Sequence, residues 1–177
     1  MTKTILATIM ILGALVTAGL SVDQAYADVF AKYDGIEGES QDSTHEKWID
    51  LSNTSWTVQR PDKSSMTPVL TTSSHYEKST VKLMESMFIG KVYPTLDIEY
   101  TRTLTCGATV TYLTYAFTNV SIIAMGESSD GDVPLVAASN AFESVKITYS
   151  EYNEDGSGPG GCGGKKGNVE ADIILGK

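Results

Sequence analysis

Polar and apolar residues alternate over several stretches of the chain, a pattern typical of β-strands with one buried face. The clearest example is the segment 96–101, where Leu96, Ile98 and Tyr100 alternate with polar neighbours. The segment 109–124 is rich in Thr, Tyr, Val and Ile, which favours a long or bent strand. The pattern therefore predicts a mainly β domain, with further strands over residues 28–33, 48–51, 55–59, 69–76, 142–153 and 169–175.

One segment has helical periodicity instead. Ser79 is a suitable N-cap and Gly90 a suitable C-cap. Between them a stripe of apolar residues recurs at helical spacing: Val81, Leu83, Met84, Met87 and Phe88. The sequence thus predicts a single short helix beside a β-barrel or β-sandwich.

The N-terminus does not belong to this fold. Lys3 gives a short positive region, residues 5–20 form an apolar run, and residues 25–27 have the small-x-small pattern of a cleavage site. This order of parts predicts a secretory signal peptide over residues 1–27, cleaved after Ala27. The alternative is a permanent membrane anchor, but the apolar run is shorter than the roughly 20 residues that span a bilayer.

Charge limits the partners of the mature chain. The protein has 177 residues, 13 basic and 22 acidic side chains, and a net charge of −9. The signal peptide removes only Lys3 and Asp23, so the mature chain keeps the whole charge. Nucleic acids and anionic lipids both require a basic surface, so we expect neither partner. No other stretch could span a membrane, and the expected location is extracellular or at the cell surface.

Export would place Cys106 and Cys162 in an oxidising compartment, where they can form one disulfide; two unpaired thiols are the alternative. Cys162 lies in the segment 156–167, which holds 7 of the 16 glycines. We expect this segment to be flexible unless the cysteine fixes it. The folded domain is therefore placed at residues 28–155, followed by a tail or short strand at residues 168–177.

Two tripeptides of the N-x-[ST] type begin at Asn53 and Asn119. In an exported protein such tripeptides are candidate acceptors for N-glycosylation. They also occur by chance in a chain this rich in Ser and Thr, so they remain candidates only.

The sequence contains only poor candidates for catalytic or metal-binding residues. His45 has no second His or Cys at zinc-binding spacing, so we expect a polar histidine in a loop. His75 is interpreted as a surface residue. Asp130 and Asp132 resemble the start of a calcium loop, but Ala141 occupies the twelfth position, where glutamate is needed. We therefore expect Asp130 and Asp132 to lie in an ordinary turn.

Paired carboxylates are the remaining catalytic candidate. Glu37 and Glu39 could serve a glycosidase, but they lie in a glycine-flanked turn without a nearby aromatic platform for a sugar. The sequence therefore predicts no catalytic set, no cofactor and no metal, and the protein is not expected to be an enzyme.

Residues 33–40, Tyr-Asp-Gly-Ile-Glu-Gly-Glu-Ser, are followed by Asp42, His45 and Trp56. This arrangement resembles the opening of the Hcp (haemolysin-coregulated protein) family, the tube proteins of type VI secretion. Two less specific blocks follow in the family's order. Residues 75–91 are similar to its strand-to-helix junction, and residues 140–149 are similar to a strand near its C-terminus.

The resemblance implies a small β-barrel of two sheets with one short flanking α-helix, assembled as a hexameric ring that stacks into a tube. Family members of the secretion machine are usually made without a signal peptide, so this chain departs from the pattern. We expect a secreted, non-enzymatic structural protein that self-assembles, with a secreted cargo or a surface partner. The alternative is a monomeric exported β-domain that binds a glycan or a cell-surface protein.

Two acidic turns are hypothesised to contribute contacts between subunits or between rings. One is the loop over residues 34–42, and the other is the turn at residues 130–132. The candidate residues are Asp34, Gly35, Glu37, Gly38, Glu39, Asp42, Asp130 and Asp132.

Overall fold

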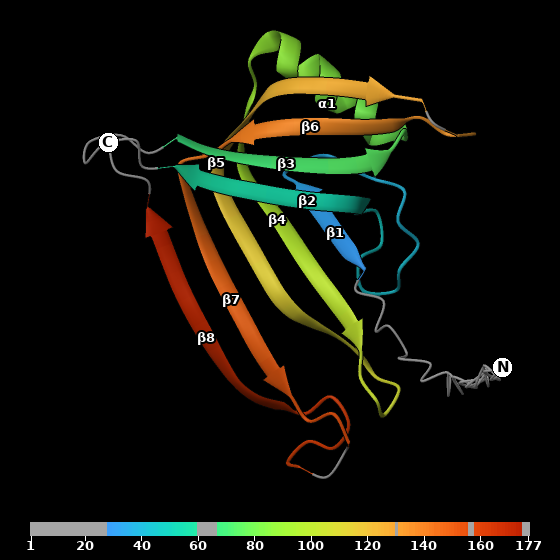
Figure 1. Cartoon of the computed structure of the whole chain (residues 1–177), viewed down its shortest axis with the longest axis vertical. Coiled ribbons are helices and arrows are strands. Elements are labelled where there is room, and N and C mark those ends of the chain that lie inside the picture. The colour runs from blue at the N-terminus through green and yellow to red at the C-terminus, as the bar shows by residue number, and fades with distance from the viewer. Residues whose placement is uncertain (1–27, 60–66, 130, 156–157, 175–177) are drawn as a thin grey trace, which may run out of the picture.

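The computed structural model describes residues 28–59, 67–129, 131–155 and 158–174, with the side chains of residues 58, 59 and 67 excepted. The proposed signal peptide with its cleavage site at Ala27, and Asp130, lie outside these ranges. The described residues form one helix, α1 (Lys78–Ile89), and eight strands (Figure 1). These are β1 (Val29–Tyr33), β2 (Ile49–Gln59), β3 (Thr67–His75), β4 (Val92–Thr103), β5 (Thr109–Ser128), β6 (Leu135–Ala141), β7 (Ser144–Tyr152) and β8 (Lys165–Ile174).

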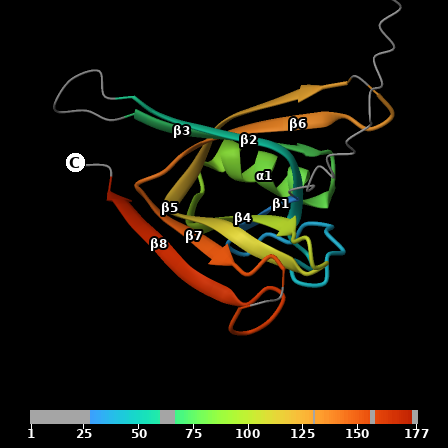
Figure 2. The same cartoon turned by 60° about the horizontal axis from the view of Figure 1, so that its bottom comes forward.

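The strands form one antiparallel sheet in the order β4-β1-β2-β3-β6-β5-β7-β8. An additional pairing of β4 with β5 closes the first six strands into a barrel, and β7 and β8 extend the sheet beyond it. Strands β2, β3 and β6 cross over the remaining strands, so that one continuous sheet makes the two layers of the barrel (Figure 2). The predicted mainly β barrel with one short helix is confirmed.

Three strands differ from the sequence expectation. The two short pieces predicted around residue 52 form a single strand, β2, because a bulge between Leu51 and Asn53 absorbs the irregularity. Strand β6 was missed, since its small residues give no apolar alternation. Strand β8 begins at Lys165, before the predicted tail, and pairs along the length of β7.

The barrel interior combines apolar packing with a buried hydrogen bond between Tyr33 and Asn140. Its fully buried side chains include Leu96, Ile98 and Phe117. The buried Tyr33 hydroxyl donates to Asn140 Oδ1 at 3.0 Å, and burial raises the pKa of that hydroxyl to about 12. The Asn140 amide is thereby fixed among apolar residues, where an unpaired group would be costly.

Helix α1 is present as predicted, but its cap and its buried face are not those expected. Glu77 precedes the helix as the N-cap in place of Ser79, and its backbone N–H donates to the Thr80 hydroxyl at 3.2 Å. The buried helical residues are Ser79, Thr80, Leu83 and Ser86. Val81 and Phe88 of the predicted apolar stripe are 54% and 83% exposed. The predicted C-cap, Gly90, is correct and has φ 65°.

Candidate functional site

The loop after β1, residues 34–48, contains most of the residues proposed for assembly contacts and is termed the acidic loop. Its backbone folds upon itself, because Gly38 N–H donates to Lys47 O at 2.8 Å and Ser40 N–H donates to Trp48 O at 2.9 Å. A side chain at Gly38 would place its Cβ 2.1 Å from Trp48 O. Glycine is therefore required there by close approach of two backbone segments.

His45 attaches this loop to the barrel wall. His45 lies in a loop as predicted, but its side chain is buried, with only 2% of it exposed. Its Nδ1 lies 2.9 Å from Asp42 Oδ1, and its Nε2 lies 2.9 Å from Glu99 Oε2 on β4. The ring stacks on Phe30 of β1 at 4.1 Å and meets Trp48 edge-on. The sequence could not indicate this, because Glu99 is 54 residues away.

Asp42 organises the same corner from within the loop. Its Oδ1 accepts the Thr44 hydroxyl at 2.7 Å and the backbone N–H groups of Thr44 and His45 at 2.9 Å. These donors, with the Thr44 hydroxyl foremost and the His45 ring next, hold the pKa of the Asp42 carboxyl well below its usual range. The carboxylate is thus fixed in its charged form as a local cap.

A second attachment joins the acidic loop to α1. Glu39 N–H donates to Glu77 Oε2 at 2.9 Å, and Lys78 N–H donates to Glu39 Oε1 at 3.3 Å. The Ser79 hydroxyl also donates to the Glu77 carboxylate. Burial raises the pKa of Glu77 despite these hydrogen bonds. The loop is therefore held between β4 and the start of the helix.

The residues proposed for assembly contacts thus divide into two groups. Gly38, Glu39 and Asp42 make contacts within the chain, whereas Glu37 pairs with Lys47 at 3.4 Å on the surface. Asp34, Gly35 and Asp132 are also exposed, and Gly35 has φ 74° in its turn. Asp130 lies outside the described residues.

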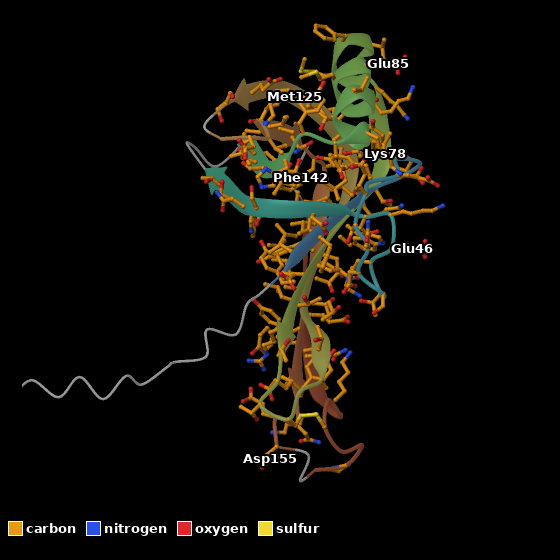
Figure 3. The ribbon with its side chains drawn as sticks, turned by 90° about the vertical axis from the view of Figure 1, so that its right-hand side faces the viewer. Glu46, Lys78, Glu85, Met125, Phe142 and Asp155 are labelled. Atoms are coloured by element: carbon orange, nitrogen blue, oxygen red, sulfur yellow. A yellow bond between two sulfur atoms is a disulfide. The ribbon has the colours of Figure 1, made fainter. Side chains whose placement is uncertain are left out.

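Large apolar side chains are exposed in several places, among them the end of the helix and the edge strand β8. Phe88 (83%), Ile89 (71%) and Val92 (54%) lie close together in the chain at the end of α1 and the start of β4, and they are termed the helix-end patch. Val169 (67%) and Ile174 (73%) lie on the edge strand β8, where their separation of five residues places their side chains on opposite faces of the sheet. Figure 3 shows the helix at one end of the long axis and the loop near Asp155 at the other. Sequence periodicity missed the helix-end patch because it assigned Phe88 to the buried face.

Cys106 and Cys162 form a disulfide that joins the β4–β5 connection to the glycine-rich connection between β7 and β8. The described part of this glycine-rich segment is anchored to Asn153. Asn153 N–H donates to Gly164 O at 2.9 Å, and the Asn153 side-chain amide donates to Pro159 O at 2.9 Å. The cysteine therefore fixes one side of the segment that was expected to be flexible without it.

Both glycosylation candidates have exposed side chains. Asn53 lies on β2, and Asn119 lies on β5 with a φ of 50°. The Asn119 side-chain amide donates to the Glu143 carboxylate, so attachment of a glycan there would replace this contact.

The described residues were also compared with the requirements of a metal site and of a membrane-spanning helix. Those residues contain no group of three or more His, Cys, Asp or Glu side chains that could hold a metal ion. They also contain no helix with the length and apolar character needed to cross a bilayer. His75 is exposed on β3, as its interpretation as a surface residue requires.

The fold and this site define a small closed β-barrel protein with one helix, two added strands and exposed apolar patches. A sequence model of the family described as "Type VI secretion system effector, Hcp" matches residues 30–154, and the chain belongs to this family. No curated protein matches the chain.

Solved structures agree on the fold. A structure described as a type six secretion system protein aligns with a TM-score of 0.71 at 21% identity, covering 85% of this chain and 96% of the other. Hcp1 from Salmonella typhimurium aligns with a TM-score of 0.68 at 23% identity, covering 84% and 94%. A type VI secretion system effector from Yersinia pestis aligns with a TM-score of 0.66 at 23% identity, covering 84% and 100%.

Proposed function

We propose that residues 28–177, after export and cleavage at Ala27, act as a non-enzymatic structural subunit that self-assembles into rings of six copies. Membership of the Hcp family and the resemblance of the acidic loop support this function. The observation that carries it is that one subunit exposes two different surfaces, the helix-end patch and the edge strand β8 with its exposed Val169 and Ile174.

Two unlike surfaces favour a head-to-tail contact. A contact between identical surfaces gives a two-fold dimer, whereas a contact between different surfaces repeats from copy to copy and closes into a ring when the rotation allows. Val169 and Ile174 lie on β8, which pairs only with β7 among the described strands. An exposed edge strand is a surface on which another chain can dock.

The charge of the chain predicts how assembly responds to salt. Each subunit carries a net charge of −9, so neighbouring copies in a ring repel one another. Added salt screens that repulsion within about 10 Å at 0.1 M. We expect the ring to form more readily as salt rises.

The test is the mass of the mature 28–177 protein in solution, measured by light scattering, with its shape examined by electron microscopy. Val92→Lys places a charge in the helix-end patch, and Val81→Lys is the matched control, since both valines are 54% exposed. We expect rings for the native protein and the control, and smaller species for Val92→Lys. A native protein that stays monomeric at all salt concentrations would overturn the proposal and favour the monomeric binding module.

A further inference from the structure

Strand β8 is held to the barrel by very little apolar packing. Nine of its ten residues are exposed, and the tenth, Ile173, is half-buried against the core. Among the described strands β8 pairs only with β7, at the edge of the sheet (Figure 1). Its side chains contribute surface contacts such as the ion pair between Glu170 and Lys146 at 2.9 Å. Segments with so few buried apolar contacts open locally at a small cost in free energy, so the pairing of β8 depends on what holds its ends.

The connection that leads into β8 is rich in glycine. In its described part, Gly160, Gly161 and Gly163 have φ values of 84°, 67° and 77°. Glycine adopts these conformations without strain, but it loses more conformational entropy than other residues when the chain becomes ordered. Hydrogen bonds join this connection to Asn153, the residue that follows β7. The disulfide of Cys162, three residues before β8 begins, joins it covalently to the turn between β4 and β5.

The chain up to residue 154 is held at the same turn by contacts that do not involve the disulfide. Arg102 Nη2 lies 3.0 Å from Glu154 Oε1. The backbone oxygen of Glu154 accepts the Cys106 N–H at 3.0 Å and the Thr105 hydroxyl at 2.6 Å. The family match also ends at residue 154. Opening the disulfide should therefore leave the barrel and β7 in place and release only the connection and β8.

The disulfide can be reached by other thiols while the protein is folded, because Cys106 and Cys162 are both exposed. Exposed disulfides are the ones that exchange readily. A thiolate of a dithiol reductant attacks one sulfur, and the other sulfur leaves as a thiolate and takes up a proton. The second thiol of the reductant then closes a disulfide of its own and releases the first cysteine. Two electrons and two protons pass to the protein, and a disulfide oxidant takes them back in the reverse reaction.

We propose that the Cys106–Cys162 disulfide is a redox switch that controls whether β8 is ordered. In the oxidised protein β8 pairs along β7 and presents its free edge, whereas in the reduced protein β8 separates and β7 becomes the edge of the sheet. The link to assembly rests on the proposed function, because export carries the chain from a reducing to an oxidising compartment. The edge on which another copy docks is then complete only after export.

Hydrogen–deuterium exchange with mass spectrometry tests the switch on the mature 28–177 protein. The amides of residues 165–174 are followed at low salt and low concentration, where light scattering gives the mass of one subunit. Dithiothreitol is the reductant, and the double variant Cys106→Ser with Cys162→Ser reproduces the reduced state without it. We expect exchange in residues 165–174 to become at least about tenfold faster in both reduced forms. The amides of α1 should keep their protection, and dithiothreitol should change nothing in the double variant.

Faster exchange confined to β8 and the connection before it supports the switch. Equal exchange of β8 in the oxidised and reduced forms would overturn it. Loss of protection throughout the chain would also overturn it, because the disulfide would then support the whole fold.

Light scattering at higher salt examines the link to assembly, and we expect rings for the oxidised native protein only. Rings of the same mass in the double variant would overturn that link. Absence of rings in the oxidised protein would count against the proposed function alone, because the exchange measurement is made on single subunits.

Discussion

Replacing His45 by phenylalanine tests whether this buried ring attaches the acidic loop to the barrel. Phenylalanine can keep the stacking on Phe30 at 4.1 Å but cannot contact a carboxylate through hydrogen bonds. The substitution therefore removes the links to Asp42 and Glu99 while retaining an aromatic ring. We expect the folded state to lose stability and the acidic loop to detach first.

The magnitude follows from the burial of the groups. Leaving a buried hydrogen-bonding group without its partner costs about 1–3 kcal/mol, and more when that group is charged, as a carboxylate is. Here the histidine is 2% exposed, but the carboxylates of Asp42 and Glu99 are 34% and 26% exposed, so water can replace part of each lost contact. We therefore expect a loss of about 2–4 kcal/mol in the free energy of unfolding.

Urea unfolding, followed by far-ultraviolet circular dichroism, measures this loss of stability. The protein concentration is kept the same for all variants, because any association of copies would add to the apparent stability. The control is His75→Phe, since His75 is exposed on β3. The control should change the free energy of unfolding by less than about 0.5 kcal/mol. If His45→Phe is no less stable than this control, the attachment described for the acidic loop is incorrect.

Three further predictions concern other parts of the subunit. Cys106→Ser opens a cross-link between residues 56 apart and should cost up to about 4 kcal/mol, while a reducing agent should destabilise the native protein but not this variant. Gly38→Ala forces a side chain against a backbone carbonyl and should cost about 1–3 kcal/mol or more in urea unfolding, whereas Gly126→Ala, with open space around it, should be well tolerated. Because the folded-state pKa of Asp42 lies below its unfolded value of 3.8, its stabilisation is fully present above that pH and is lost progressively as the pH falls from there towards the lower folded-state pKa; unfolding measured from pH 7 to pH 3 covers the start of this loss and should show a flatter acid limb for Asp42→Asn.

Much of the fold could be predicted because its signals are local. Alternation in β4 and the length of β5 are visible in the sequence, and Gly90 ends the helix where a left-handed residue is needed. The motif of the acidic loop indicated the Hcp family, to which the chain belongs. Strand β6 escaped prediction because alanine, serine and asparagine give no alternation, although β3 and β5 pair with it on both sides.

The sequence by itself determined the mainly β character of the chain, the position of its helix and its excess of acidic charge. Tertiary structure decided which side of α1 is buried, because the barrel packs on small hydroxyl residues and leaves Phe88 exposed. It also decided that His45 meets Glu99 and that Arg102 lies in a pocket with Lys166. These outcomes depend on strand pairing between residues far apart, and local patterns of polar and apolar residues carry no information about such pairs.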